Sequence, residues 1–261
     1  MLSEAPIKLV DATAKYLRAP VEPRWYLAYG SNLSTSGFLV ARHITPLAKK
    51  VVLAKGIELA FDHHGIPYVE PRFANIRFVR ETVPEFDLEK EWTGRGALLG
   101  VAFLLTPQDF VQILKVEGAG TLYQPLEVQA NVVSEYNRVL EETVDVYTLM
   151  TEERRTRPGQ ASLRYMSLIR NENKMPPSYI RYLESTPHFT PISTRQQWGL
   201  SVVRATWARF MFFFFRKMAQ YADKDGNLPI WMKTTRATIH GCMWFAYDWF
   251  EKWVFGDGEV S

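Results

Sequence analysis

The sequence has little cysteine: Cys242 is the single one among 261 residues. One thiol excludes an internal disulfide, which suits a reducing compartment, and residues 1–20 show no secretory signal. We therefore expect a cytoplasmic protein. His240 lies two residues from Cys242, a spacing that puts the two side chains on different helical faces, so a buried, unreactive thiol is favoured over a nucleophile.

The chain also lacks a long hydrophobic run and a large excess of charge. The most prominent aromatic run, Phe210 to Phe215, is closed by Arg209 and Arg216, whereas a membrane-spanning helix needs about 20 mostly apolar residues. We expect no transmembrane segment, although a helix on a membrane surface stays open. The formal net charge is +3 without a long basic block. Nucleic acid is therefore a poor candidate partner, and a small molecule fits better.

What is present is the composition of a folded protein, with 47% hydrophobic and 23% charged residues. Segments rich in β-branched and aromatic residues predict strands between residues 25 and 150. These segments are WYLAYG, KKVVLAKGIELAF, FANIRFV, GALLGVAFLL, LEVQANVV and TVDVYTLM. So many short strands favour a barrel-like or strongly curved sheet. One helix should interrupt them after the N-cap Thr106 and Pro107.

After about residue 151 the pattern becomes helical. Helices are predicted in ASLRYMSLIRNE and PPSYIRYLES, then from Leu200 to Tyr221 and from Thr235 to Val254. The predicted fold class is α+β: a mixed barrel-like sheet with flanking helices and an aromatic-rich, helical C-terminal extension. We expect a catalytic domain over residues 1–190 and the extension, packed on it, over residues 191–261.

The pentad Tyr29-Gly30-Ser31-Asn32-Leu33 ends an apolar strand and opens a polar turn. Glycine permits a backbone with positive φ, and successive unpaired amides in such a turn form a concave group of donors. This arrangement suits a carboxylate or a phosphate. An ordinary strand-ending turn explains the pentad equally well when it is taken alone.

Glu117 is the candidate acid–base residue. It follows the helix that starts after Thr106, and it precedes Gly118, a residue suited to ending a helix. A carboxylate at this end faces the negative pole of the helix dipole, which disfavours its charged form. Helices usually carry Lys or Arg at this end, so an acid here indicates function. A solvated acid at a helix end is the simpler interpretation.

Four segments in order resemble the γ-glutamyl cyclotransferase-like family across about Trp25 to Ser185. They are YGSNL, the stretch GALLGVAFLLTPQDFVQILKVEGAGTLYQPLEV, YTLM, and ASLRYMSLIRNENKMPPSYIRYLES. The family fold is a mixed α/β barrel-like domain. Its members let the α-amine of a γ-glutamyl amide attack the γ-carbonyl, which releases 5-oxoproline and an amine. The tail MWFAYDWFEKWVFGDGE resembles extensions of fungal members that accompany secondary-metabolite pathways, such as gliotoxin-type biosynthesis on a glutathione adduct.

The resemblance implies a role for each site residue. Glu117 would be the acid–base group, the turn Tyr29-Gly30-Ser31-Asn32-Leu33 would bind the γ-glutamyl head, and Tyr123 and Tyr147 would line the pocket. Thr121 and Leu122 are bulkier than the glycines that family members often carry there.

No metal or organic cofactor is expected. His63 and His64 are adjacent, so on a strand their side chains point to opposite faces, which disfavours a paired metal site. Two alternatives to cyclotransfer stay open. One is another acid–base ring closure or elimination on the same fold. The other is a non-enzymatic binding protein whose aromatic C-terminal helices form a homodimer or a membrane-surface interface.

Overall fold

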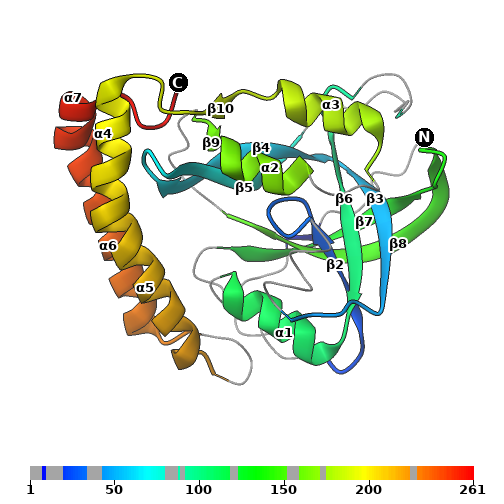
Figure 1. Ribbon diagram of the computed structural model, residues 1–261. Coiled ribbons are helices and arrows are strands. Elements are labelled where there is room, and N and C mark those ends of the chain that lie inside the picture. The colour runs from blue at the N-terminus through cyan, green and yellow to red at the C-terminus, as the bar shows by residue number, and fades with distance from the viewer. Residues whose placement is uncertain are drawn as a thin grey trace.

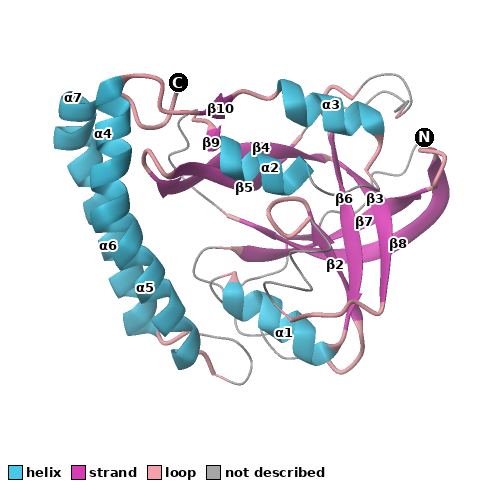
Figure 2. Ribbon diagram, viewed as in Figure 1, coloured by secondary structure: helices cyan, strands magenta, loops and turns pink. Residues whose placement is uncertain are grey.

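The computed structural model describes residues 8–9, 20–33, 43–79, 88, 92–117, 123–151, 159–170, 175–223 and 228–261. Figure 2 shows strands through the centre, short helices on either side of them and long helices along one flank. The predicted α+β class, with a barrel-like mixed sheet, flanking helices and a helical C-terminal extension, is confirmed.

The centre of the molecule is a closed, mixed sheet. Its strand order is β1-β7-β3-β6-β2-β8, and β7 also pairs with β8, which closes the barrel. Strands β2 and β8 run parallel, and the other neighbours run antiparallel. The bounds are β1 (Lys8–Leu9), β2 (Arg24–Ala28), β3 (Ala48–Lys55), β6 (Ala97–Leu105), β7 (Gln124–Val133) and β8 (Val139–Met150). Leu27, Leu98 and Val146 are fully buried in the hydrophobic core of this barrel.

A separate hairpin extends from the barrel toward the long helices (Figure 1). It consists of β4 (Ile57–Ile66) and β5 (Glu70–Phe78), which pair only with each other among the described strands. The sequence from Lys49 to Phe61 was predicted as one strand run, but it divides between the barrel and this hairpin. Gly56 makes the division, because its φ of 81° lies in the left-handed region that glycine tolerates.

Short helices flank the barrel and the hairpin. Helix α1 (Pro107–Val116) begins as predicted, with Thr106 Oγ1 accepting a hydrogen bond of 3.2 Å from the Asp109 N–H. Helices α2 (Leu163–Arg170) and α3 (Pro177–Ser185) match the other two predicted segments. The parallel strands β9 (Ala161–Ser162) and β10 (His188–Phe189) precede α2 and follow α3.

The extension forms two long antiparallel helical rods (Figure 1). The first comprises α4 (Thr194–Val203), η2 (Arg204–Ala208), α5 (Arg209–Met218) and η3 (Ala219–Tyr221). The second comprises α6 (Ile230–Ala246), η4 (Tyr247–Glu251) and α7 (Lys252–Phe255). Both rods begin before the predicted Leu200 and Thr235. A capping box of Ser193 and Gln196 starts the first rod. Pro229 is the N-cap of the second rod. In the described part of the chain, no helix combines the length and apolarity needed to cross a membrane.

Tyr68, in the turn between β4 and β5, anchors the extension to the hairpin. Its side chain is 1% exposed, and its hydroxyl donates to the Gly256 carbonyl over 2.6 Å. A Cβ on Gly199 or Gly258 would lie 2.8 Å from the Tyr68 ring, so these glycines permit the close approach. Burial raises the pKa of the Tyr68 phenol, which therefore stays a neutral donor.

A buried ion pair ties the last residues of the chain to the hairpin. Arg72 on β5 donates from Nη2 to Oε1 of Glu259, and both side chains are almost fully inaccessible to water. The Arg72 guanidinium also lies 5.2 Å from the ring of Trp244 on α6. The carbonyl of Glu259 accepts from the Gln160 N–H over 2.9 Å. These contacts hold the extension against the face of the hairpin.

Candidate active site

The segment from Tyr29 to Leu33 forms a tight turn directly after β2, in which the Leu33 N–H donates to the Gly30 carbonyl over 2.9 Å. Gly30 does not use the positive φ that glycine permits. It is needed for close approach instead, because a Cβ there would lie 2.8 Å from Tyr165 Oη and 3.2 Å from Ala74 Cβ. Leu33 is fully buried in the core, and its side chain does not line the cavity described below.

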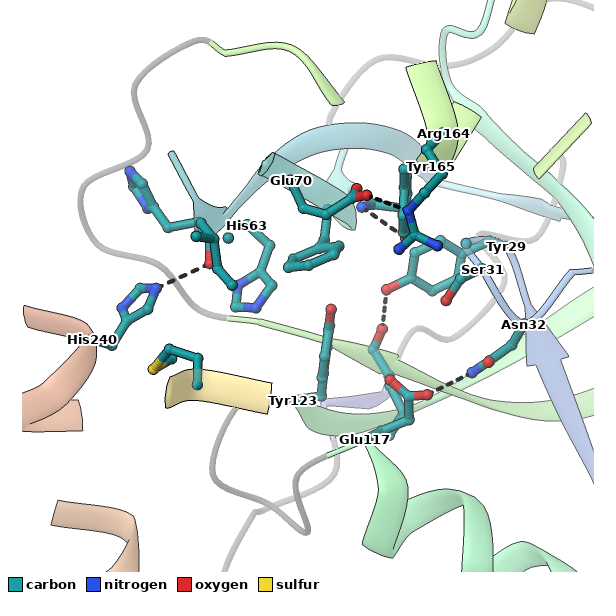
Figure 3. A pocket seen from close by; sticks show the side chains of 18 of the residues that line it. Tyr29, Ser31, Asn32, His63, Glu70, Glu117, Tyr123, Arg164, Tyr165 and His240 are labelled. Atoms are coloured by element: carbon teal, nitrogen blue, oxygen red, sulfur yellow. Dashed lines mark hydrogen bonds and ion pairs between the residues drawn. The ribbon is translucent and has the colours of Figure 1, made fainter. Parts of the chain in front are cut away.

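Glu117 lies where α1 ends, with its backbone N–H donating to the Ile113 carbonyl over 2.9 Å. Its Oε1 accepts a hydrogen bond of 2.9 Å from Nδ2 of Asn32 (Figure 3). The same Asn32 amide lies 3.2 Å from the hydroxyl of Tyr26. The structure thus brings the predicted carboxylate into contact with the predicted turn. Gly118, expected to end the helix, lies outside the described residues.

Several tyrosines surround this contact. Tyr29 donates its hydroxyl hydrogen to the Leu149 carbonyl, and the Tyr165 hydroxyl accepts from the Ala74 N–H over 3.2 Å. Burial, followed by nearby tyrosines and Glu117, raises the pKa of Tyr29 and Tyr123 well above the usual 10. Burial likewise raises the pKa of Tyr165 to about 12. These phenols therefore remain protonated at neutral pH and keep a hydrogen to donate.

These residues line a cavity of about 470 Å³, a size typical of small-molecule sites, which span about 300–1,000 Å³. Tyr26, Tyr29, Gly30, Ser31, Asn32, Glu117, Tyr123 and Tyr165 form one part of its wall. The hairpin contributes residues such as His63 and Phe73, and the extension contributes Met211, Phe212, Arg236 and His240. Figure 3 shows Tyr123 between Glu117 on one side and His240 on the other. The cavity therefore lies between the barrel and the extension.

The adjacent histidines contact different partners. The His63 ring lies 5.1 Å from Tyr123 and 6.0 Å from Phe73, measured between ring centroids, whereas His64 lies 4.7 Å from Trp244. Within the described ranges, no three His, Cys, Asp or Glu side chains are grouped so that they could hold a metal ion.

The structure does not bring every predicted residue to the cavity. Tyr147 on β8 is turned toward Phe110 of α1, with the ring centroids 5.8 Å apart, and the Arg24 guanidinium lies 4.8 Å from its ring. It therefore packs between strand and helix and does not line the cavity. Cys242 is exposed, so the prediction of a buried thiol was wrong. His240, two residues away, lines the cavity, which agrees with the prediction that the two side chains lie on different faces of the helix. Thr121 and Leu122 lie outside the described residues.

Other lining residues were not identified from the sequence. Tyr26 lies in the predicted strand WYLAYG, and Tyr165 lies in the predicted helix ASLRYMSLIRNE, but no local pattern shows that both face Glu117. Arg236 offered one signal. It is a charged residue between the apolar positions Met232 and Met243 on the buried side of α6, and a buried charge needs a partner or a function.

Comparison with known proteins finds relatives that are named γ-glutamyl cyclotransferases. The chain is 31% identical over 243 residues to "Gamma-glutamyl cyclotransferase gliK" of Aspergillus fumigatus, covering 90% of this chain and 89% of that protein. It is 29% identical to "Gamma-glutamyl cyclotransferase aclK" of Aspergillus oryzae, with 90% of both chains covered. A solved structure named "Gamma-glutamyl cyclotransferase" matches with a TM-score of 0.49 at 15% identity, covering 70% of this chain and 99% of that one. No family model matches the sequence.

A mixed barrel in a chain with these relatives defines an enzyme of the cyclotransferase type. The chain belongs to the γ-glutamyl cyclotransferase family. Within that family it is similar over 90% of its length to the fungal proteins gliK and aclK.

Proposed function

We propose that the protein cleaves a γ-glutamyl amide, such as a glutathione conjugate or a related biosynthetic intermediate, and releases 5-oxoproline and an amine. The observation that carries this proposal is the contact between Glu117 and Asn32 on the wall of the cavity. It places a carboxylate beside the turn that would bind the γ-glutamyl head. The reaction is intramolecular and closes a five-membered ring, so the protein's tasks are to fix the substrate conformer and to transfer protons.

Glu117 would carry both proton transfers. As a carboxylate it takes a proton from the α-amine while the amine nitrogen attacks the γ-carbonyl carbon. It then returns that proton to the departing amide nitrogen as the carbon–nitrogen bond breaks. The Asn32 amide donates to this carboxylate over 2.9 Å and so orients it.

The tyrosines and the turn would bind the charged parts of the reacting group. Ser31, which faces the Tyr165 hydroxyl, and the rest of the Gly30 to Asn32 turn would hold the α-carboxylate. The protonated phenol of Tyr123 would donate to the oxyanion that develops on the γ-carbonyl, because its raised pKa keeps the hydrogen in place. Ring closure of this kind involves proton transfer and no redox change, so we propose no metal or organic cofactor.

We further propose the division expected from the sequence. Residues 1–190 would form the catalytic domain, and residues 191–261 would be an extension that packs on it and completes the cavity. The extension supports this view by contributing Met211, Phe212, Arg236 and His240 to the lining.

Release of 5-oxoproline, measured by mass spectrometry, tests the proposal. The substrates are glutathione and several S-substituted glutathiones, incubated with the wild type and with Glu117→Gln. We expect 5-oxoproline from at least one conjugate with the wild type and a rate lower by about 100-fold or more with the variant, in line with the loss of a general acid–base group. Equal rates for the two proteins would refute the role of Glu117. Glu135→Gln, on an exposed turn, is the matched control and should leave the rate unchanged.

A further inference from the structure

The part of the cavity wall that the extension contributes carries a buried cation. Arg236 on α6 is 6% exposed and lines the cavity. The buried residues of the same helix are otherwise Met232, Met243 and Trp244, so the guanidinium interrupts an apolar surface. Burial lowers the pKa of Arg236 to about 10, and the nearby Tyr123 phenol partly opposes this shift. Arg236 therefore remains charged at neutral pH despite the cost of desolvation.

Both carboxylates that line the cavity accept hydrogen bonds. Glu117 accepts from Asn32 over 2.9 Å. Glu70 accepts from Ser162 Oγ over 2.8 Å and from Arg164 Nε over 2.8 Å. Arg164 also lines the cavity, but its side chain is 70% exposed. The two lining arginines thus differ in exposure: Arg164 is a surface residue, whereas Arg236 is held away from water.

Glu117 and Arg236 line the same cavity, one from the end of α1 and the other from α6. The cavity volume of about 470 Å³ leaves room for a ligand that extends beyond its γ-glutamyl group. Tyr123 lines the same cavity and interacts electrostatically with both groups. A ligand that places its γ-glutamyl amide at Glu117 can therefore present the end of a dipeptide-sized amine to Arg236.

We propose that Arg236 binds a carboxylate at the far end of the leaving amine, so that the preferred substrates are γ-glutamyl dipeptides with a free C-terminal carboxylate. This inference rests on the proposed function and narrows its substrate class. A guanidinium suits the role because its planar donors match a carboxylate in two parallel hydrogen bonds. Phe73, Met211 and Phe212 also line the cavity and provide apolar surface that suits a substituent on the middle residue. Arg236 acts here as a specificity-determining residue, whereas the proton transfers belong to Glu117.

Binding of two matched ligands tests the proposal. The ligands are γ-glutamyl-S-methylcysteinylglycine and its C-terminal carboxamide, and calorimetry is performed in the Glu117→Gln background so that turnover is slow. We expect the carboxylate to bind about 10- to 100-fold more tightly than the carboxamide, the effect of a charge-assisted hydrogen bond. Adding Arg236→Gln should reduce this ratio to near one, and adding Arg236→Lys should retain part of it. Arg209→Gln, an exposed arginine of α5, should leave the ratio unchanged.

The ratio of the two affinities separates recognition from a structural role. A variant that merely disturbs the fold weakens both ligands alike, and thermal melting of each variant reports the fold directly. Three results would overturn the inference. The affinity ratio is the same with Arg236 intact and with Arg236→Gln, the protein with Arg236 intact does not prefer the carboxylate, or it binds neither ligand. The proposed function fails by a different result, namely unchanged 5-oxoproline release after Glu117→Gln. In the protein with Glu117 intact, we expect Arg236→Gln to raise KM for the carboxylate substrate and to leave kcat within about 3-fold.

Discussion

The side-chain amide of Asn32 lies 2.9 Å from the carboxylate of Glu117, although 85 positions of sequence separate the two residues. Asn32 follows a barrel strand and Glu117 ends a helix, so the barrel itself sets their contact. Asn32 is 7% exposed, which limits competition from water. The amide thus fixes the orientation of the carboxylate before a substrate arrives.

Replacing Asn32 by alanine should lower kcat. The change removes a hydrogen bond to a charged group, which contributes about 1.5–3 kcal/mol, and it leaves the Glu117 carboxylate free to rotate. We expect kcat for 5-oxoproline release to fall about 10- to 100-fold, with a smaller change in KM. Asn131→Ala is the control, because that amide donates to the Leu140 carbonyl at an exposed position. Equal kcat values for the two variants would contradict the role given to Asn32.

Gly30→Ala should destabilise the turn through a steric conflict that a second substitution relieves. The new methyl group would lie 2.8 Å from Tyr165 Oη, and overpacking of this kind costs about 1–3 kcal/mol. Removing the hydroxyl with Tyr165→Phe should restore part of the lost free energy of unfolding in the double variant. Urea unfolding of the wild type, the two single variants and the double variant gives the coupling free energy between the two positions. If the effects of the two substitutions are simply additive, the conflict lies elsewhere.

The buried pair of Arg72 and Glu259 should matter more than a surface pair. Glu259→Gln leaves the Arg72 charge buried without its carboxylate, and breaking a buried pair costs about 3–5 kcal/mol. Glu142→Gln breaks the exposed pair with Lys50, and such pairs contribute about 0–1 kcal/mol. Free energies of unfolding measured in urea should show this order. Similar losses for the two variants would indicate that the buried pair contributes no more than the exposed one.

The lowered pKa of Asp257 predicts that the stability of the fold depends on pH. Burial raises the pKa of its carboxyl, but hydrogen bonds from Lys252 and from the Glu259 N–H outweigh burial and lower it overall. A carboxyl whose folded pKa is below its unfolded value stabilises the fold above the unfolded pKa, near 3.9, and this contribution disappears as pH falls through the folded pKa. Asp257→Asn should therefore cost more at pH 7 than at pH 3. Because the group is partly exposed, we expect a difference of at most about 1 kcal/mol. A larger loss at pH 3 would reverse the assigned sign.

The homodimer expected through the C-terminal aromatic helices remains a prediction. Phe213, Phe245 and Trp249 are 56%, 64% and 72% exposed, and exposed apolar surface of this kind is typical of interaction sites. We expect the protein to sediment at twice the monomer mass and the triple serine variant at these positions to sediment as a monomer. A monomeric wild type at micromolar concentration would exclude this interface.

Local signals in the sequence predicted much of the barrel and the first part of the site. Thr106 and Pro107 specify the start of α1 through capping, which depends on neighbouring residues alone. The turn after β2 and the acid at the end of α1 were recognised from residue types that break or end regular structure. Their mutual contact followed only from the family resemblance, because no local rule reports a hydrogen bond across 85 positions.

Features that depend on distant packing were missed or misread. The segment from Lys49 to Phe61 has strand-forming residues throughout. No local pattern shows that the chain passes from the barrel to the hairpin at Gly56. Tyr147 has a strand position, but its surroundings depend on where α1 packs against the barrel, and its ring contacts Phe110. The role of α6 as a cavity wall depends on how the extension docks on Tyr68 and Arg72. The early start of α4 does not depend on distant packing, because Ser193 and Gln196 form a capping box, which is a local sequence pattern.

The division of the cavity wall between two stretches of the chain has a consequence for protein engineering. Glu117 and its hydrogen-bond partner belong to the barrel, whereas Met211, Phe212, Arg236 and His240 belong to helices added after it. Randomising these four codons alone would generate a library in which every member keeps the same proton-transfer apparatus. Under the proposed function, such a library would vary the amine that is accepted while the ring-forming step stays constant.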